Sequence, residues 1–254
     1  DGANFNAIVG RVRPGDLGVD CMHINLHKTF STPHGGGGPG SGPTVLSDAL
    51  SAFAPLPYVV KDGDRFRLVE HPGDADEKPF GRMKGFHGQM GMFVRAIAYM
   101  LSHGKDGLRQ VSGDAVLNAN YILASLKDVM TAPFGGPCMH EALFDDAFLK
   151  DTGVSTLDFA KAMIDEGFHP MTMYFPLVVH GAMLMEPTET EGREALDEFI
   201  GSMRFLAEKA KAGDVDRFKN APQLTPWRRL DETGAARKPV LRWTPPEPDQ
   251  QAAE

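Results

Sequence analysis

The sequence has little cysteine, no excess of positive charge and no long apolar run. Its two cysteines, Cys21 and Cys138, are too few for a disulfide framework, so we expect a reducing, cytoplasmic setting. A formal net charge of −8 provides no basic stripe that could neutralise nucleic-acid phosphates. No apolar stretch approaches the roughly 20 residues that cross a bilayer. These absences argue against nucleic-acid binders, membrane proteins and disulfide scaffolds.

The length and the two ends of the chain suggest part of a larger protein. The 254 residues, 42% of them apolar, are enough for one large domain or two smaller ones. The sequence starts on Asp1-Gly2-Ala3-Asn4 with neither an initiator methionine nor a preceding strand, so we expect the C-terminal portion of a longer polypeptide. Residues 244–254 are rich in proline and polar side chains and are predicted to be a disordered tail.

The first half of the chain alternates short elements with long helices. The pattern predicts a strand over 19–26, a loop over 31–43, a helix within 44–53 and a hairpin over 58–69 with Asp62-Gly63 at its turn. A helix is expected over 81–103, stopped by Gly104, and another over roughly 106–130. Their predicted apolar faces are Phe86, Met90, Phe93, Val94 and Ile97, and Val116, Leu117, Tyr121, Leu123 and Leu126.

The second half reads as a smaller α/β lobe after a boundary at 131–137. Its pattern predicts strands near 138–144, 171–178 and 181–186, and helices near 156–166 and 190–211. Ser155 with Asp158, and Thr188 with Glu191, have the spacing of capping boxes at the helix starts. We therefore expect residues 1–104 to be the end of a large domain with its linking helix, and residues 105–243 to be a small C-terminal domain.

The most informative residue is Lys28, within Asn25-Leu-His-Lys-Thr-Phe30 and shortly before the glycine run 35–38. A lysine after an apolar strand can form a Schiff base with a carbonyl cofactor, and glycines let backbone approach a ligand closely. A solvated surface lysine and a plain flexible turn are the alternatives, and the loop lacks the Gly-Lys-Ser/Thr of a P-loop. Asp1 lies 27 residues earlier, and pyridoxal phosphate needs both a lysine and a carboxylate.

These segments resemble a known family. The chain is similar to glycine decarboxylase, the pyridoxal-phosphate P protein of the glycine cleavage system, and most to the C-terminal half of the second subunit of two-subunit bacterial forms. The resemblance is carried by residues 1–10, 23–30 and 34–40, with shorter matches at 85–88, 94–96, 139–141, 169–176, 186–191 and 236–243.

The resemblance implies a fold-type-I pyridoxal-phosphate enzyme of the α/β class, here the end of the large cofactor domain plus the smaller C-terminal α/β domain. It implies that Lys28 forms the Schiff base and that Asp1 pairs with the pyridinium nitrogen, which keeps the ring an electron sink. Asn4 matches a hydrogen-bond donor to the phenolic oxygen of the cofactor. His27 and Asn25 match positions that contact its phosphate.

The implied activity is that of glycine dehydrogenase (aminomethyl-transferring), an oxidoreductase that decarboxylates glycine and passes the aminomethyl group to the lipoyl arm of a carrier protein. The implied partners are the first subunit, in a hetero-oligomer, and the lipoylated carrier. Part of the family's cofactor pocket would lie upstream of Asp1, so the isolated chain is expected to bind pyridoxal phosphate poorly and to be inactive.

Two other functions stay open: a non-catalytic assembly module, and another fold-type-I enzyme such as a desulfurase or amino-acid decarboxylase. Several side chains have ordinary explanations. His23 can face the site or the core, and His34 with the glycines can shape its mouth. Arg95 is interpreted as a structural ion pair. His140-Glu141 lacks a third metal ligand, and nothing activates the Cys138 thiol. The acidic residues of 186–191 are interpreted as a strand end and helix cap.

Overall fold

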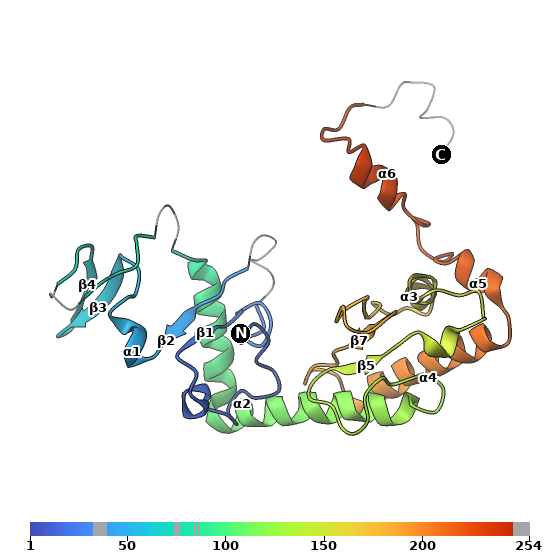
Figure 1. The fold of residues 1–254 in the computed structure, drawn as a ribbon, viewed down its shortest axis with the longest axis horizontal. Helices are drawn as coiled ribbons and strands as arrows, with labels where there is room; N and C mark the ends of the chain where they lie inside the picture. Colours follow the sequence, from blue (N-terminus) through green and yellow to red (C-terminus); the bar gives the residue numbers. More distant parts are fainter. Residues whose placement is uncertain (33–39, 74–76, 84, 86, 246–254) are drawn as a thin grey trace. The chain divides into compact units, whose positions relative to one another are not determined.

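The computed structural model describes residues 1–32, 40–73, 77–83, 85 and 87–245 (Figure 1). The predictions for His34, glycines 35–38, Phe86 and most of the tail lie outside these residues. The chain divides into two compact units. Unit 1 comprises residues 1–127, 132–143 and 184–198, and unit 2 comprises residues 128–131, 144–183 and 199–254.

Unit 1 begins with short elements that hold the turn of Lys28. A 3-10 helix, η1 (Pro14–Leu17), precedes β1 (Cys21–His23), which pairs antiparallel with β2 (Thr44–Leu46). The strand predicted over 19–26 is therefore shorter, although Leu26 N still donates to Ser41 O at 2.9 Å. The predicted helix over 44–53 is reduced to α1 (Asp48–Ser51). The first three residues of this range form β2 and pair with β1, as the β-branched Val45 at their centre favours. A strand of three residues is too short for the sequence pattern to reveal.

The predicted hairpin is confirmed. Strands β3 (Tyr58–Asp62) and β4 (Arg65–Val69) pair antiparallel with Asp62 opposite Arg65. The two residues between them are therefore Gly63 and Asp64, one position later than expected. Gly63 has φ of +60°, a left-handed conformation that glycine adopts without steric cost.

Helix α2 (Met90–Leu126) is bent where the sequence predicts a break. Gly104 has φ 63° and ψ −174°, outside the helical region, and the ribbon turns there (Figure 1). The first segment starts at Met90, not near residue 81, and it buries Met92 and Ala96. The predicted apolar face is wrong here, because Met90, Val94 and Ile97 are exposed. In the second segment Leu126 is buried as expected, whereas Leu117 is exposed.

The rest of the chain contains the predicted strands and helices in the predicted order with tighter bounds, together with short helices that the pattern does not predict. They are β5 (Ala142–Phe144), η3 (Ala147–Leu149), α3 (Thr156–Asp165), β6 (Thr172–Met173), β7 (Met183–Met185), α4 (Arg193–Lys211), α5 (Val215–Lys219) and α6 (Glu232–Arg237). The three strands form a sheet in the order β5-β7-β6. No helix in the described part of the chain combines the length and apolarity that a bilayer crossing requires.

The capping box predicted at Ser155 and Asp158 is confirmed, and Asp158 also organises unit 2. Its carboxylate is 3% exposed and pairs with Lys219 Nζ at 2.6 Å and Arg229 Nη1 at 2.8 Å. Burial acts to raise the pKa of Asp158, but hydrogen bonds from Lys219, Ser155 and Arg229 outweigh it and lower the pKa to about 2. One carboxylate thus ties α3 to α5 and to the segment beyond it.

We expect Asp158→Asn to lower the free energy of unfolding at pH 7 by about 3 kcal/mol, because it leaves two cations without their buried partner. The lowered pKa means that the wild-type carboxylate stabilises the fold above its ordinary pKa of 3.8 and loses this effect as the pH falls toward about 2. The variant should therefore lose less stability in this range. Urea unfolding followed by circular dichroism measures both effects.

Glu208→Gln is the matched control, because Glu208 is exposed on α4 in the same unit. It should unfold at the wild-type urea concentration. An Asp158→Asn protein with wild-type unfolding at pH 7 would contradict the role assigned to this carboxylate.

Candidate functional site

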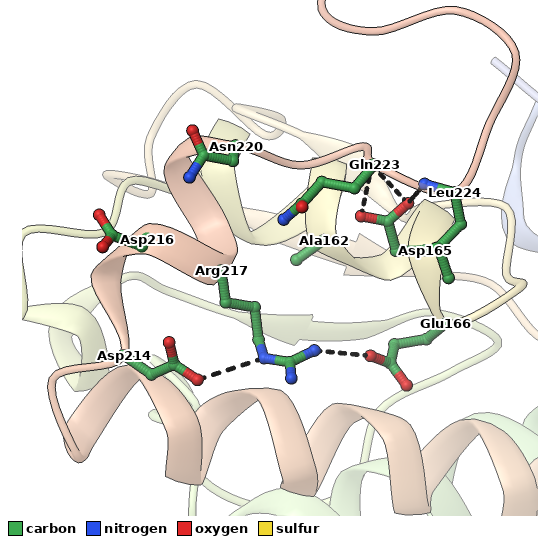
Figure 2. Close-up of a pocket in the computed structure, with 9 residues that line it drawn as sticks. All are labelled: Ala162, Asp165, Glu166, Asp214, Asp216, Arg217, Asn220, Gln223 and Leu224. Atoms are coloured by element: carbon green, nitrogen blue, oxygen red, sulfur yellow. Dashed lines mark hydrogen bonds and ion pairs between the residues drawn. The ribbon is translucent and has the colours of Figure 1, made fainter.

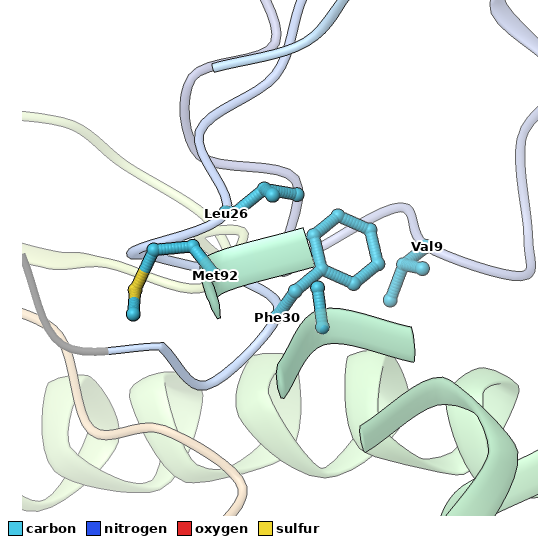
Figure 3. Close-up of a cluster of buried hydrophobic side chains, with 5 residues drawn as sticks. Val9, Leu26, Phe30 and Met92 are labelled. Atoms are coloured by element: carbon cyan, nitrogen blue, oxygen red, sulfur yellow. The ribbon is translucent and has the colours of Figure 1, made fainter. Parts of the chain in front are cut away.

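Lys28 lies on a turn in which three of the other side chains are buried. Residues 26–30 form this turn, not the end of a strand as predicted. Leu26, Thr29 and Phe30 are 6%, 3% and 8% exposed, while Lys28 is exposed. Leu26 and Phe30 pack with Val9 and with Met92 and Ala96 of α2 (Figure 3). Burial of each large apolar side chain is worth about 1.5–3 kcal/mol, so the anchored neighbours hold Lys28 outward.

The first residues of the chain lie beside this turn. Gly2 forms a parallel bridge with Ile24, and its N–H donates to His23 O at 2.8 Å. Phe5 N donates to the hydroxyl of Thr29 at 2.7 Å. Asp1 is exposed, and its Oδ1 accepts a hydrogen bond from Ala3 N. The structure therefore brings the segment of Asp1 and Asn4 alongside the turn of Lys28, as a shared site requires.

The structure adds Glu186, His140 and Asn6 to this region, which the sequence did not assign to it. Glu186 Oε1 accepts a hydrogen bond from Asn4 Nδ2 at 2.6 Å and one from Asn6 Nδ2 at 3.3 Å. His140 Nε2 lies 3.9 Å from the same oxygen. The resemblance to the family at 186–191 is the sequence signal that points to Glu186, although the acidic residues there also fit a strand end and a helix cap. Glu186 does follow β7 directly, and α4 begins only at Arg193.

Glu141 is a further carboxyl group in this region, and Lys28 is one of the charges that act on it. Burial raises the pKa of Glu141, and the neighbouring charge of Glu186 also raises it, whereas His140 and Lys28 lower it. No group of three metal-ligating side chains occurs among the described residues. In this region the amine can bind an aldehyde, the carboxyl groups can bind a cation, and the amide donors can bind an oxyanion.

His27 lies close to the backbone of Gly40, and Asn25 lies close to the backbone of Gly42. Asn25 Nδ2 is 2.6 Å from His23 Nε2. A Cβ atom at Gly40 would come within 2.3 Å of the His27 ring, and one at Gly42 within 2.1 Å of the His23 ring. Gly40 and Gly42, which follow the glycine run 35–38, are needed so that the two histidines can occupy their positions.

Of two other side chains, Arg95 is placed differently from the prediction, whereas Cys138 agrees with it. Arg95 is exposed on α2, and across the described ranges no ion pair of Arg95 is found. Cys138 is partly buried, and burial raises the pKa of its thiol, which disfavours the nucleophilic thiolate.

A cavity of about 480 Å³ in unit 2 is lined by acidic side chains and by Arg217 (Figure 2). Most of its charged side chains already have partners within the protein. Both Asp165 oxygens accept backbone N–H groups, and Arg217 lies 3.5 Å from Glu166 and 3.3 Å from Asp214. None of the predicted site residues lines it, so we assign the site to the region of Lys28.

Gly40→Ala should displace the His27 imidazole, because the new Cβ atom overlaps the ring. We expect overpacking to lower the free energy of unfolding by about 1–3 kcal/mol and to shift the ring resonances of His27. Thermal unfolding and NMR measure these changes. Gly15→Ala is the control, since nothing lies within 4 Å of its added atom. Unchanged His27 resonances in Gly40→Ala would contradict the close approach.

Comparisons with known proteins give one family model, curated relatives and a solved structure that resemble this chain. Residues 111–226 match the family model described as glycine dehydrogenase, C-terminal domain. The probable glycine dehydrogenase (decarboxylating) subunit 2 of Caulobacter vibrioides is 74% identical over 96% of this chain and 47% of the relative. The corresponding protein of Staphylococcus haemolyticus is 52% identical over 96% and 48%. The chain thus spans about half the length of the curated relatives it matches.

A crystal structure of glycine decarboxylase (P-protein) of the glycine cleavage system, in inhibitor-bound form, aligns with a TM-score of 0.61 and 20% identity. The alignment covers 78% of this chain and 46% of that one. At this identity the likeness concerns the fold alone, and it confirms the predicted α/β fold class of the fold-type-I enzymes. By its sequence, the chain is similar to the C-terminal part of glycine dehydrogenase (decarboxylating) subunit 2.

Proposed function

We propose that the chain supplies the lysine-bearing part of a pyridoxal-phosphate site that decarboxylates glycine in a glycine dehydrogenase (aminomethyl-transferring). One observation carries this proposal. Lys28 is held exposed by a turn with buried neighbours, and the segment bearing Asp1 and Asn4 lies along that turn. A site of this class needs an amine, a carboxylate and hydrogen-bond donors on one edge of the fold.

The side chains around Lys28 fit pyridoxal phosphate. Among the described residues no ion pair of Lys28 is found, so its amine is available to an aldehyde. Asn6 Oδ1 and both ring nitrogens of His140 are buried without a hydrogen-bond partner in the described part of the chain. Buried polar atoms normally have partners, and a bound group or water can supply them. The polar atoms therefore support a ligand site next to Lys28.

When bound, pyridoxal phosphate supplies an electron sink for the carbanion that decarboxylation leaves. Lys28 would bind the aldehyde group through its Nζ and would move protons at that atom. The Asp1 carboxylate would bind the ring N–H and so keep that nitrogen protonated. Asn4 would donate to the phenolic oxygen, and His27 and Asn25 would hold the phosphate.

The reaction breaks the bond between the carboxylate and the α-carbon of glycine and releases carbon dioxide. The disulfide of an oxidised lipoyl arm then opens. One sulfur bonds to the methylene carbon, and the other takes up a proton and becomes a thiol. We propose that the lipoylated carrier protein and the first subunit are the partners, that the assembly is a hetero-oligomer, and that it works in the cytoplasm.

We expect Lys28→Ala to abolish the imine absorbance that appears when pyridoxal phosphate is added to the complete natural polypeptide with its first subunit. The same variant should lose glycine-dependent exchange of labelled carbon dioxide. The reason is that no other amine can take the place of Lys28 in the turn. Lys61→Ala removes an exposed lysine from the hairpin and should leave both measurements unchanged.

The chain of residues 1–254 by itself should give a much weaker absorbance band than the complete polypeptide. A wild-type assembly that shows no imine band, or a Lys28→Ala protein that retains it, would refute the proposed function.

A further inference from the structure

Glu186 joins side chains that come from three distant parts of unit 1. The end of β7 supplies its carboxylate, the start of the chain supplies Asn4 and Asn6, and the segment before β5 supplies His140. The Glu186 side chain is 34% exposed and the His140 side chain 12% exposed. The bond from Asn4 is the shortest of these contacts, at 2.6 Å, as expected for an amide donor and a charged acceptor.

The side-chain amide of Asn4 is fixed at both of its ends. Its Oδ1 accepts a hydrogen bond from Asn6 N at 3.2 Å, and its Nδ2 donates to Glu186. A rotation of the amide by 180° would place its oxygen against the carboxylate of Glu186 and its NH2 group against an N–H. Because an NH2 group carries two hydrogens, one N–H of Asn4 is left to donate to a ligand.

We propose that Glu186 is a positioning residue of the pyridoxal-phosphate site, which holds the Asn4 amide so that its second N–H donates to an anionic oxygen of the bound cofactor. The inference rests on the proposed function, because Asn4 is assigned to that oxygen there. Glu186 itself touches Asn4, Asn6 and His140 and acts on the ligand through Asn4.

The test measures the pH at which the absorbance of bound pyridoxal phosphate changes, in the complete natural polypeptide with its first subunit. Glu186→Ala should raise this midpoint by about one pH unit, because an oxygen that loses a donor holds a neighbouring proton more tightly. Asn4→Ala should raise it by a similar amount. Glu186→Gln keeps an acceptor oxygen and should raise it in the same direction by less.

The double variant separates positioning from a general structural role. If Glu186 acts through Asn4, Glu186→Ala should produce no further shift in an Asn4→Ala protein, whereas independent effects would add. Glu191→Ala is the control, since Glu191 is exposed in the same segment and should leave the midpoint unchanged. If Glu186→Ala does not fold, the Gln variant is used in the same comparison.

A midpoint that Glu186→Ala and Glu186→Gln leave unchanged would overturn the inference, and so would additive shifts in the double variants. The proposed function would survive these results, because the wild type would still bind pyridoxal phosphate through Lys28. A wild-type assembly without any cofactor band would refute both.

Discussion

The exposed position of Lys28 depends on the burial of the apolar side chains on either side of it. Leu26 and Phe30 pack against α2, and Ala96 is small enough for the turn to approach the helix closely. The hydroxyl of buried Thr29 then binds the backbone of Phe5, so the same anchor positions the start of the chain. The candidate site is thus built on the core of unit 1, and not on a surface loop.

The carboxyl groups of Glu186, Glu141 and Asp158 differ in their burial and in their partners. Glu186 accepts hydrogen bonds from two amide donors and lies 3.9 Å from an imidazole nitrogen. Glu141 is next to the same imidazole, but burial favours its neutral form. Asp158 in unit 2 shows the opposite result for a buried carboxyl, because two cations outweigh burial there. Burial alone therefore does not decide the direction of the pKa shift, because the partners of Asp158 outweigh it and those of Glu141 do not.

Local signals in the sequence predicted local structure well. The break at Gly104, the hairpin at Gly63 and the cap at Ser155 each depend on a few adjacent residues. The apolar pattern of α2 did not show which side packs, because small Ala96 lies on the buried face and Met90 and Val94 lie outside. Family motifs singled out Lys28, Asp1 and Asn4. Glu186 could not be paired with Asn4, because 182 residues separate them and no spacing rule connects such distances.

The Asn4 amide, held between Asn6 N and Glu186, has one further consequence. A side chain that is ordered only when a ligand binds loses rotational entropy at that moment, and the affinity falls accordingly. Asn4 loses this freedom earlier, when the chain folds. The entropic cost of ordering this donor therefore lowers the stability of unit 1, and it does not lower the affinity for the ligand.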